Sequence, residues 1–251
     1  MESSLRTLMD DIPAGLLQEV LEILKPLKGM RVALCSDSNI TLNMVVLTHL
    51  KVSELMVNSA KDSAPIHILK NRFRNYLKTK FVLYEHHIIA TFLTPSYRSV
   101  PKNHCDSKLV NDSMKLLKSY LEEVPESDDE DDVNQPENIH DQSSSNGLFS
   151  SFKETPVQAP IESSNELSDY VGYKLTKYDI DCSPFEFWSL KRSIFPKLCN
   201  IAKWILSCPA TSTSSERVFS KLGNIITPSR NLLDPDMVDK ISFVSSNSDM
   251  I

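Results

Sequence analysis

A single carboxylate, Glu216, stands inside the run "PATSTSSERVFS" (residues 209–220), among hydroxyl side chains and just ahead of an apolar helical face. A glutamate can bind a divalent metal ion, but this run supplies no second carboxylate to bind it. Thr213 followed three residues later by Glu216 is instead typical of a capping box, in which each side chain accepts a hydrogen bond from the other residue's amide. The local sequence therefore predicts a helix cap at Thr213 and Glu216. The helix after it would have a buried stripe of Val218, Phe219 and Leu222 and would end near Gly223.

The histidines and cysteines form no recognisable metal site. "YEHH" (84–87) and "NHC" (103–105) contain possible ligands, but neither is joined by a second pair at zinc-finger spacing, so ordinary surface or turn histidines are favoured. The five cysteines include no C-x-x-C pair, which indicates reduced thiols rather than a disulfide framework. The sequence also lacks a phosphate-binding glycine motif and a G-x-S-x-G elbow. We therefore expect no metal, no cofactor and no small-molecule substrate.

Composition favours a soluble intracellular protein with one acidic segment. The chain has 251 residues, 41% of them apolar, and a formal net charge of −6. It lacks an apolar stretch long enough to span a membrane, and its first residues do not resemble a secretory signal. Residues 122–170 carry one lysine against 14 acidic residues, whereas the flanking parts are mildly basic. We expect residues 122–168 to be a disordered linker, because so few aliphatic side chains cannot offset the entropy of ordering.

The linker contains Ser127, which is followed directly by acidic residues in "ESDDED". This pattern suits an acid-directed kinase. A solubilising linker without a regulatory role is the alternative.

Residues 1–121 are predicted to be a helical array. "PAGLLQEVLEILKPL" and "NITLNMVVLTHLKVSELM" carry apolar residues at helical spacing, and the first of these helices is expected to end at Pro26 and Gly29. "APIHILKNRFRNYLKTKF" begins with Pro65 in its first turn and has a basic outer face, which is either a solvated surface or a weak nucleic-acid site. "SKLVNDSMKLLKSYLEE" gives one more amphipathic helix. The candidate nucleic-acid residues are Arg72, Arg74 and Lys78.

Residues 169–251 contain three clear helix starts. Ser183, Pro184 and Glu186 form a capping box with proline in its preferred first position. Pro196 begins a second helix in "FPKLCNIAKWILS", on which Trp204 points away from the apolar face. Asp234 and Pro235 begin the last helix. These short helices carry more apolar surface than they can bury alone, which favours association with another chain. The predicted dimerisation or core residues are Trp188, Phe195, Leu198, Ile201, Ile205, Phe219, Leu222, Ile241 and Val244.

An ordered pattern of about 60 residues after Phe187 resembles the C-terminal dimerisation region of hAT-type transposases and their BED zinc-finger relatives. Its parts are a tryptophan, "FPKLCNIA", "PATSTSSERVFS", "GNII", an arginine before "NLL", and a closing helix. Upstream, "IIATFLTPSYRSV" is similar to the block that ends the helical insertion of that family. It departs from the family pattern at Thr94 and Ser96, where aspartate and arginine are usual.

The resemblance implies a mainly α chain. It would be an incomplete RNase H-like transposase core in which a helical insertion (1–121) and a dimerisation region (169–251) pack on each other and on a second copy. Glu216 matches the third metal ligand of the family, but the chain is expected to begin after the strands that carry the two aspartates. The resemblance therefore implies a non-enzymatic dimerisation module in the nucleus, a truncated or domesticated transposase that pairs with itself or with related hAT proteins. The alternative is a fragment of a DNA-binding transposase that is active only at full length.

Overall fold

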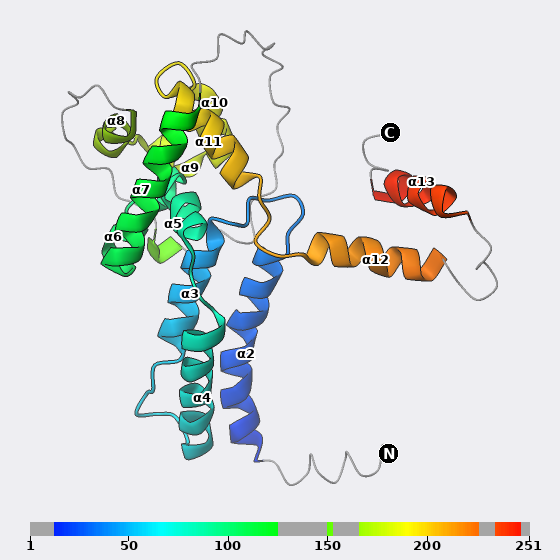
Figure 1. Cartoon of the computed structure of the whole chain (residues 1–251). Helices are drawn as coiled ribbons and strands as arrows, with labels where there is room; N and C mark the ends of the chain where they lie inside the picture. Colours follow the sequence, from blue (N-terminus) through cyan, green and yellow to red (C-terminus); the bar gives the residue numbers. More distant parts are fainter. Residues whose placement is uncertain (1–12, 125–149, 153–165, 226–233, 247–251) are drawn as a thin grey trace.

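The computed structural model describes residues 13–124, 150–152, 166–225 and 234–246, and within these ranges the regular structure is helical (Figure 1). The longer elements of the first part are α2 (Ala14–Leu34), α3 (Met44–Leu55), α4 (Ala64–Lys80), α5 (Glu85–Phe92) and α7 (Ser107–Glu123). Shorter ones are η1 (Pro95–Tyr97), α6 (Val100–His104) and η2 (Ser150–Phe152). The second part has α8 (Glu166–Gly172), α9 (Lys177–Asp181), α10 (Pro184–Leu190), α11 (Pro196–Leu206), α12 (Thr213–Ile225) and α13 (Pro235–Ser246). The expectation of a mainly α chain is confirmed over these ranges.

One hydrophobic cluster lies between α2, α3 and α4. Met30 of α2, Val46 and Leu47 of α3, and Ile66 of α4 are almost fully buried in it. These residues occupy one face of each helix, as the apolar spacing in the sequence predicts. Helix α2 runs beside α3 and α4 in the lower part of Figure 1.

The second cluster joins the two parts of the sequence. It combines Ile89 and Phe92 of α5 and Leu117 of α7 with buried residues of α8, α10 and α11, among them Trp188 and Leu198. Phe81, Leu83 and Met114 are packed against both clusters, so the apolar interior is continuous. The expectation that the first part packs on the C-terminal part is therefore confirmed. The packing depends on contacts between residues far apart in sequence.

The prediction that the first helix ends at Pro26 is wrong, because α2 continues through Pro26 to Leu34. Proline removes one backbone hydrogen bond, the one that would go to the carbonyl of Glu22. Glu22 is exposed, so that carbonyl lies on the side that water can reach. Continued burial of Met30 beyond the proline outweighs the lost bond.

The boundaries of the acidic segment also differ from the prediction. Helix α7 extends to Glu123 and α8 begins at Glu166, so both ends of the predicted linker are helical. Most of the remaining linker, including Ser127, lies outside the described residues.

The two clearest helix starts are confirmed. The hydroxyl of Ser183 accepts a hydrogen bond from the amide of Glu186, 3.1 Å away, at the start of α10. The Glu186 carboxylate does not complete the capping box and instead accepts a hydrogen bond from the hydroxyl of Tyr178. At the start of α13, the carboxylate of Asp234 accepts from the amide of Asp236. Proline at the first position favours both helix starts, because its fixed φ suits a helix and the N–H that it lacks would have no helical partner there.

Two further expectations concern the cysteines and the membrane. All five cysteines are free thiols, as their spacing predicts. Across the part of the chain that the structure describes, no helix has both the length and the apolar character needed to cross a membrane.

Candidate functional site

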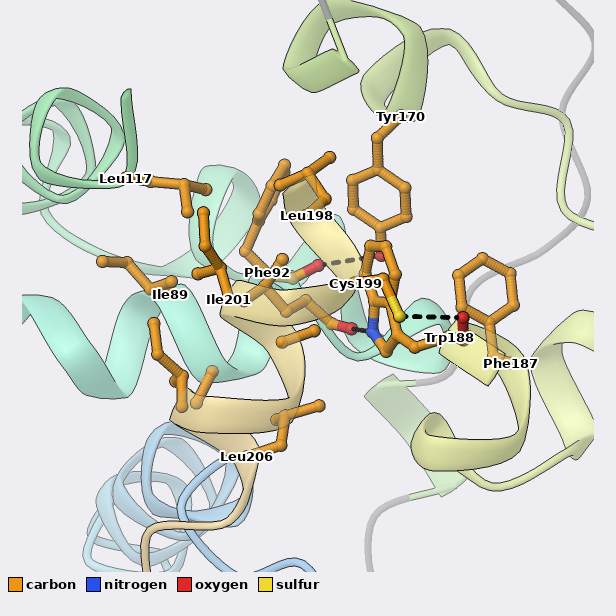
Figure 2. Packing of buried hydrophobic residues seen from close by; sticks show 14 of the residues in the cluster. Ile89, Phe92, Leu117, Tyr170, Phe187, Trp188, Leu198, Cys199, Ile201 and Leu206 are labelled. Carbon is orange, nitrogen blue, oxygen red and sulfur yellow. Dashed lines mark hydrogen bonds between the residues drawn. The ribbon is translucent and has the colours of Figure 1, made fainter. Parts of the chain in front are cut away.

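The first half of the C-terminal region is built into the interior of its own chain. The indole nitrogen of Trp188 donates a hydrogen bond to the carbonyl oxygen of Leu93, 2.8 Å away, and the hydroxyl of Tyr170 donates to the carbonyl of Phe92 (Figure 2). The Tyr170 ring lies 5.0 Å from Trp188 and 5.8 Å from Phe195, measured between ring centroids. These contacts bury the polar atoms of Trp188 and Tyr170 together with their rings, which avoids the cost of an unpaired buried donor.

Helix α11 completes this interior. Leu198, Ile201 and Ile205 are each no more than 3% exposed and lie against α5 and α7. With Trp188 and Phe195, they account for five of the nine residues predicted to serve dimerisation or the core. The side chains of these five residues are buried within the chain, so they form part of its core. They are not exposed to another chain.

The block that resembles the end of the hAT insertion holds the second part in place. Arg98 donates hydrogen bonds to the carbonyls of Tyr170 and Tyr173, and its guanidinium lies 5.2 Å from the centre of the Tyr170 ring. The hydroxyl of Ser96 donates to the carbonyl of Ile180, 2.6 Å away. The hydroxyl of Thr94 accepts from the amide side chain of Asn43. Thr94 and Ser96, where the chain departs from the family pattern, therefore serve packing between elements.

Helices α12 and α13 project from this body as an arm, which we define as residues 213–225 and 235–246 (Figure 1). The two helices pack against each other. Phe219 is 71% exposed and Val244 is 53% exposed, whereas Leu222 and Ile241 are half-buried. The prediction of a buried stripe on α12 is therefore wrong at Phe219. Two short helices in contact cover only one face of each other, and the Phe219 side chain lies on the uncovered side.

Glu216 does not form the predicted capping box. Helix α12 begins at Thr213, one residue earlier than predicted, so Glu216 is the fourth helical residue rather than the third. Its amide donates to the carbonyl of Ser212, and its carboxylate accepts from the Ser212 hydroxyl at 3.2 Å. The Thr213 amide points instead to the hydroxyl of Thr211. Glu216 is exposed on the arm.

Potential metal ligands are not gathered around Glu216. Among the residues that the structure describes, no three histidine, cysteine, aspartate or glutamate side chains lie close enough together to hold a metal ion. The arrangement around Glu216 is a local contact at the start of a helix.

The three basic residues considered for nucleic acid have different environments on α4. Arg72 and Lys78 are exposed, whereas the guanidinium of Arg74 donates a hydrogen bond to the carbonyl of Met56, 2.7 Å away. Lys70, on the same helix, is buried and paired with Asp62 at 2.7 Å. The hydrogen bond from Lys70 is the main reason that the pKa of Asp62 lies below its usual value. Part of this basic face therefore stabilises the connection between α3 and α4.

Comparison with known protein families identifies the C-terminal part. Residues 166–248 match the family described as the hAT family C-terminal dimerisation region. The chain carries a hAT dimerisation region. This hAT region begins with α8 and includes the buried helices as well as the arm. The sequence resemblance to hAT proteins is thereby confirmed.

One curated relative extends the similarity over nearly the whole chain, and others match about a third of it. Human "Zinc finger protein 618" is 26% identical over 245 residues, which is 96% of this chain and 24% of that protein. Human "Zinc finger BED domain-containing protein 6" is 30% identical over 81 residues, or 32% of this chain and 8% of that protein. The "Putative AC transposase" of Zea mays is 30% identical over 78 residues, or 31% of this chain and 10% of that protein. The chain thus spans about a quarter of the length of the first relative.

Proposed function

We propose that this chain is a dimerisation module derived from a hAT transposase, and that it associates with a second copy, or with a related hAT protein, through the arm. The observation that carries this proposal is the division of the hAT region into a buried half and an exposed half. Trp188, Phe195 and the apolar face of α11 are buried in the chain's own core. Helices α12 and α13, in contrast, keep large apolar side chains in contact with water.

The exposed side chains of the arm favour a protein partner. Phe219, Met237 and Val244 are each at least 49% exposed. Full burial of an exposed side chain of this size contributes about 1.5–3 kcal/mol, and these partly covered side chains would each contribute part of that amount. A two-fold pairing of two arms would double each such contact, because an isologous interface uses the same patch on both copies.

The proposal includes a non-enzymatic role. In the family resemblance Glu216 is the third of three metal-binding carboxylates of an RNase H-like fold, and a two-metal phosphoryl transfer requires the other two. The chain would be the helical part of such a core in a truncated or domesticated transposase. Its zinc-finger and BED-domain relatives support a nuclear location.

Sedimentation velocity over a range of micromolar concentrations tests the proposal. The wild-type chain should show a concentration-dependent monomer–dimer equilibrium, and a Phe219→Ser/Val244→Ser variant should shift toward monomer. The matched control is Val57→Ser/Ile68→Ser, which removes side chains that are 62% and 57% exposed on the body. The control should dimerise as the wild type does. A strictly monomeric wild type would contradict the proposal.

A fragment of a DNA-binding transposase, active only at full length, is the competing function. Exposed Arg72 and Lys78 favour it, whereas the hydrogen bond from Arg74 to the carbonyl of Met56 occupies a donor that would otherwise be available to a phosphate. Such a fragment would retain duplex DNA at low salt and lose it steeply as salt increases. A gel-shift titration with the Arg72→Gln/Lys78→Gln variant as control distinguishes this function from dimerisation alone.

A further inference from the structure

The first turn of the arm meets the connection between α2 and α3. Ser214 and Arg217, one helical turn apart on α12, both donate hydrogen bonds to the carboxylate of Asp37. Arg217 also donates to the carbonyl of Cys35, 2.8 Å away. These contacts join positions separated by 177 to 182 residues. The base of α12 is thus held by residues that precede the acidic segment.

Two more contacts tie the segment before α12 to the same connection. The amide of Ala210 donates to the hydroxyl of Thr41 at 2.9 Å, and the hydroxyl of Thr213 lies 3.2 Å from the sulfur of Cys35. The α2–α3 connection therefore contacts α12 and the chain leading into it on several sides. Beyond this base, α12 extends away from the body (Figure 1).

The charge of Asp37 is stabilised in this position. The hydrogen bond from Ser214, followed by the nearby charges of Arg217 and Lys221, holds the pKa of Asp37 below its usual value. Asp37 and Arg217 are about half exposed, so their ion pair contributes little to the stability of the fold itself. Its geometric effect is larger, because it fixes the direction of a helix attached at one end.

We propose that Asp37 is a positioning residue for association: it sets the angle at which α12 presents Phe219 to a second copy of the chain. This inference rests on the proposed function of the arm. A helix of 13 residues is about 20 Å long, so a small rotation at its base displaces its far end by several ångströms. Interfaces between helices require packing as close as that of a protein interior. An arm free to pivot would also lose more conformational entropy when it binds.

The test compares the dimer dissociation constant of Asp37→Ala with that of the wild type by sedimentation. We expect the constant to increase roughly fivefold to tenfold, as for the loss of a charged hydrogen-bonded pair near the surface. The thermal midpoint should stay unchanged, because Asp37 lies outside both hydrophobic clusters. The charge-swapped variant Asp37→Arg/Arg217→Asp should recover part of the lost affinity, which a merely structural role would not predict.

Asp112→Asn is the matched control, because it removes an exposed pair with Lys115 on α7, far from the arm. It should dimerise as the wild type does. If Asp37→Ala dimerises normally while the wild type is a dimer, the positioning role is refuted and the arm remains the interface. If Asp37→Ala reduces the free energy of unfolding by as much as it reduces the free energy of dimerisation, Asp37 is a structural residue and the inference is wrong. A monomeric wild type would overturn the proposed function and this inference together.

Discussion

The indole nitrogen of Trp188 lies 2.8 Å from the carbonyl oxygen of Leu93, although 95 residues separate them in sequence. This hydrogen bond crosses from α10 to the end of α5, and both residues are fully buried. Replacing Trp188 with Phe keeps an aromatic ring but leaves the Leu93 carbonyl without this donor. We expect the free energy of unfolding to fall by about 1–3 kcal/mol, measured by urea denaturation.

Trp204 supplies the control for this prediction. It is 56% exposed on α11 and packs edge-on against Tyr120. Trp204→Phe should change the free energy of unfolding by no more than about 0.5 kcal/mol. Equal effects at both positions would show that the burial of Trp188 is not what stabilises the fold.

The shared core makes a prediction about cooperativity. Leu117 belongs to the part before the acidic segment and Leu198 to the part after it, yet both are fully buried in one cluster. Leu117→Ala and Leu198→Ala should each cost about 2–5 kcal/mol. Both should shift the same single transition, whether it is followed by circular dichroism or by tryptophan fluorescence. Two separate transitions would refute the single core.

Stability should decrease in mild acid because of two half-buried histidines. Burial is the main cause that lowers the pKa of both His49 and His87. The Nδ1 atom of His87 also accepts a hydrogen bond from the amide of Tyr84, which protonation would remove. Below a pH of about 6.5 the unfolded chain therefore binds protons that the folded chain does not, and the free energy of unfolding falls as the pH decreases.

Urea denaturation over this pH range measures the effect. His87→Gln should reduce the slope, since glutamine can accept from the Tyr84 amide without titrating. A stability that rises toward acid would contradict the assignment.

Glu216 is expected to be dispensable for the folded state. Its carboxylate is exposed and accepts a hydrogen bond from Ser212 only one turn away. Glu216→Gln should shift the free energy of unfolding by no more than about 0.5 kcal/mol. Added Mg²⁺ should leave the thermal midpoint of the wild type and of Glu216→Gln unchanged from its value without Mg²⁺. A midpoint that rises with Mg²⁺ in the wild type and not in Glu216→Gln would reveal a working metal site.

Helix starts could be predicted from the sequence because their signals are local. Ser183 before Pro184, and Asp234 before Pro235, each fix a helix through contacts within a few residues. Pro26 misled the prediction, since the packing of Met30 against neighbouring helices outweighs a local break. Helix α12 begins one residue earlier than predicted, and this difference is enough to remove the capping box at Glu216.

Surfaces could not be predicted in the same way, because they depend on which neighbour covers a helix. Trp188 and Phe219 are both large aromatic residues in a hAT region, yet one is fully buried and the other is 71% exposed. Likewise, no local pattern connects Asp37 with Arg217 across 180 residues. Only the tertiary fold brings that pair together.

In the proposed dimer the arm, and not the buried half of the hAT region, forms the contact between copies. Amide hydrogen exchange at concentrations above and below the dimer dissociation constant tests it most directly. On dilution, the amides of α12 and α13 should lose protection, while those of α10 and α11 should exchange at the same rate in monomer and dimer. Loss of protection in α10 and α11, with no change in α12 and α13, would rule out an interface formed by the arm.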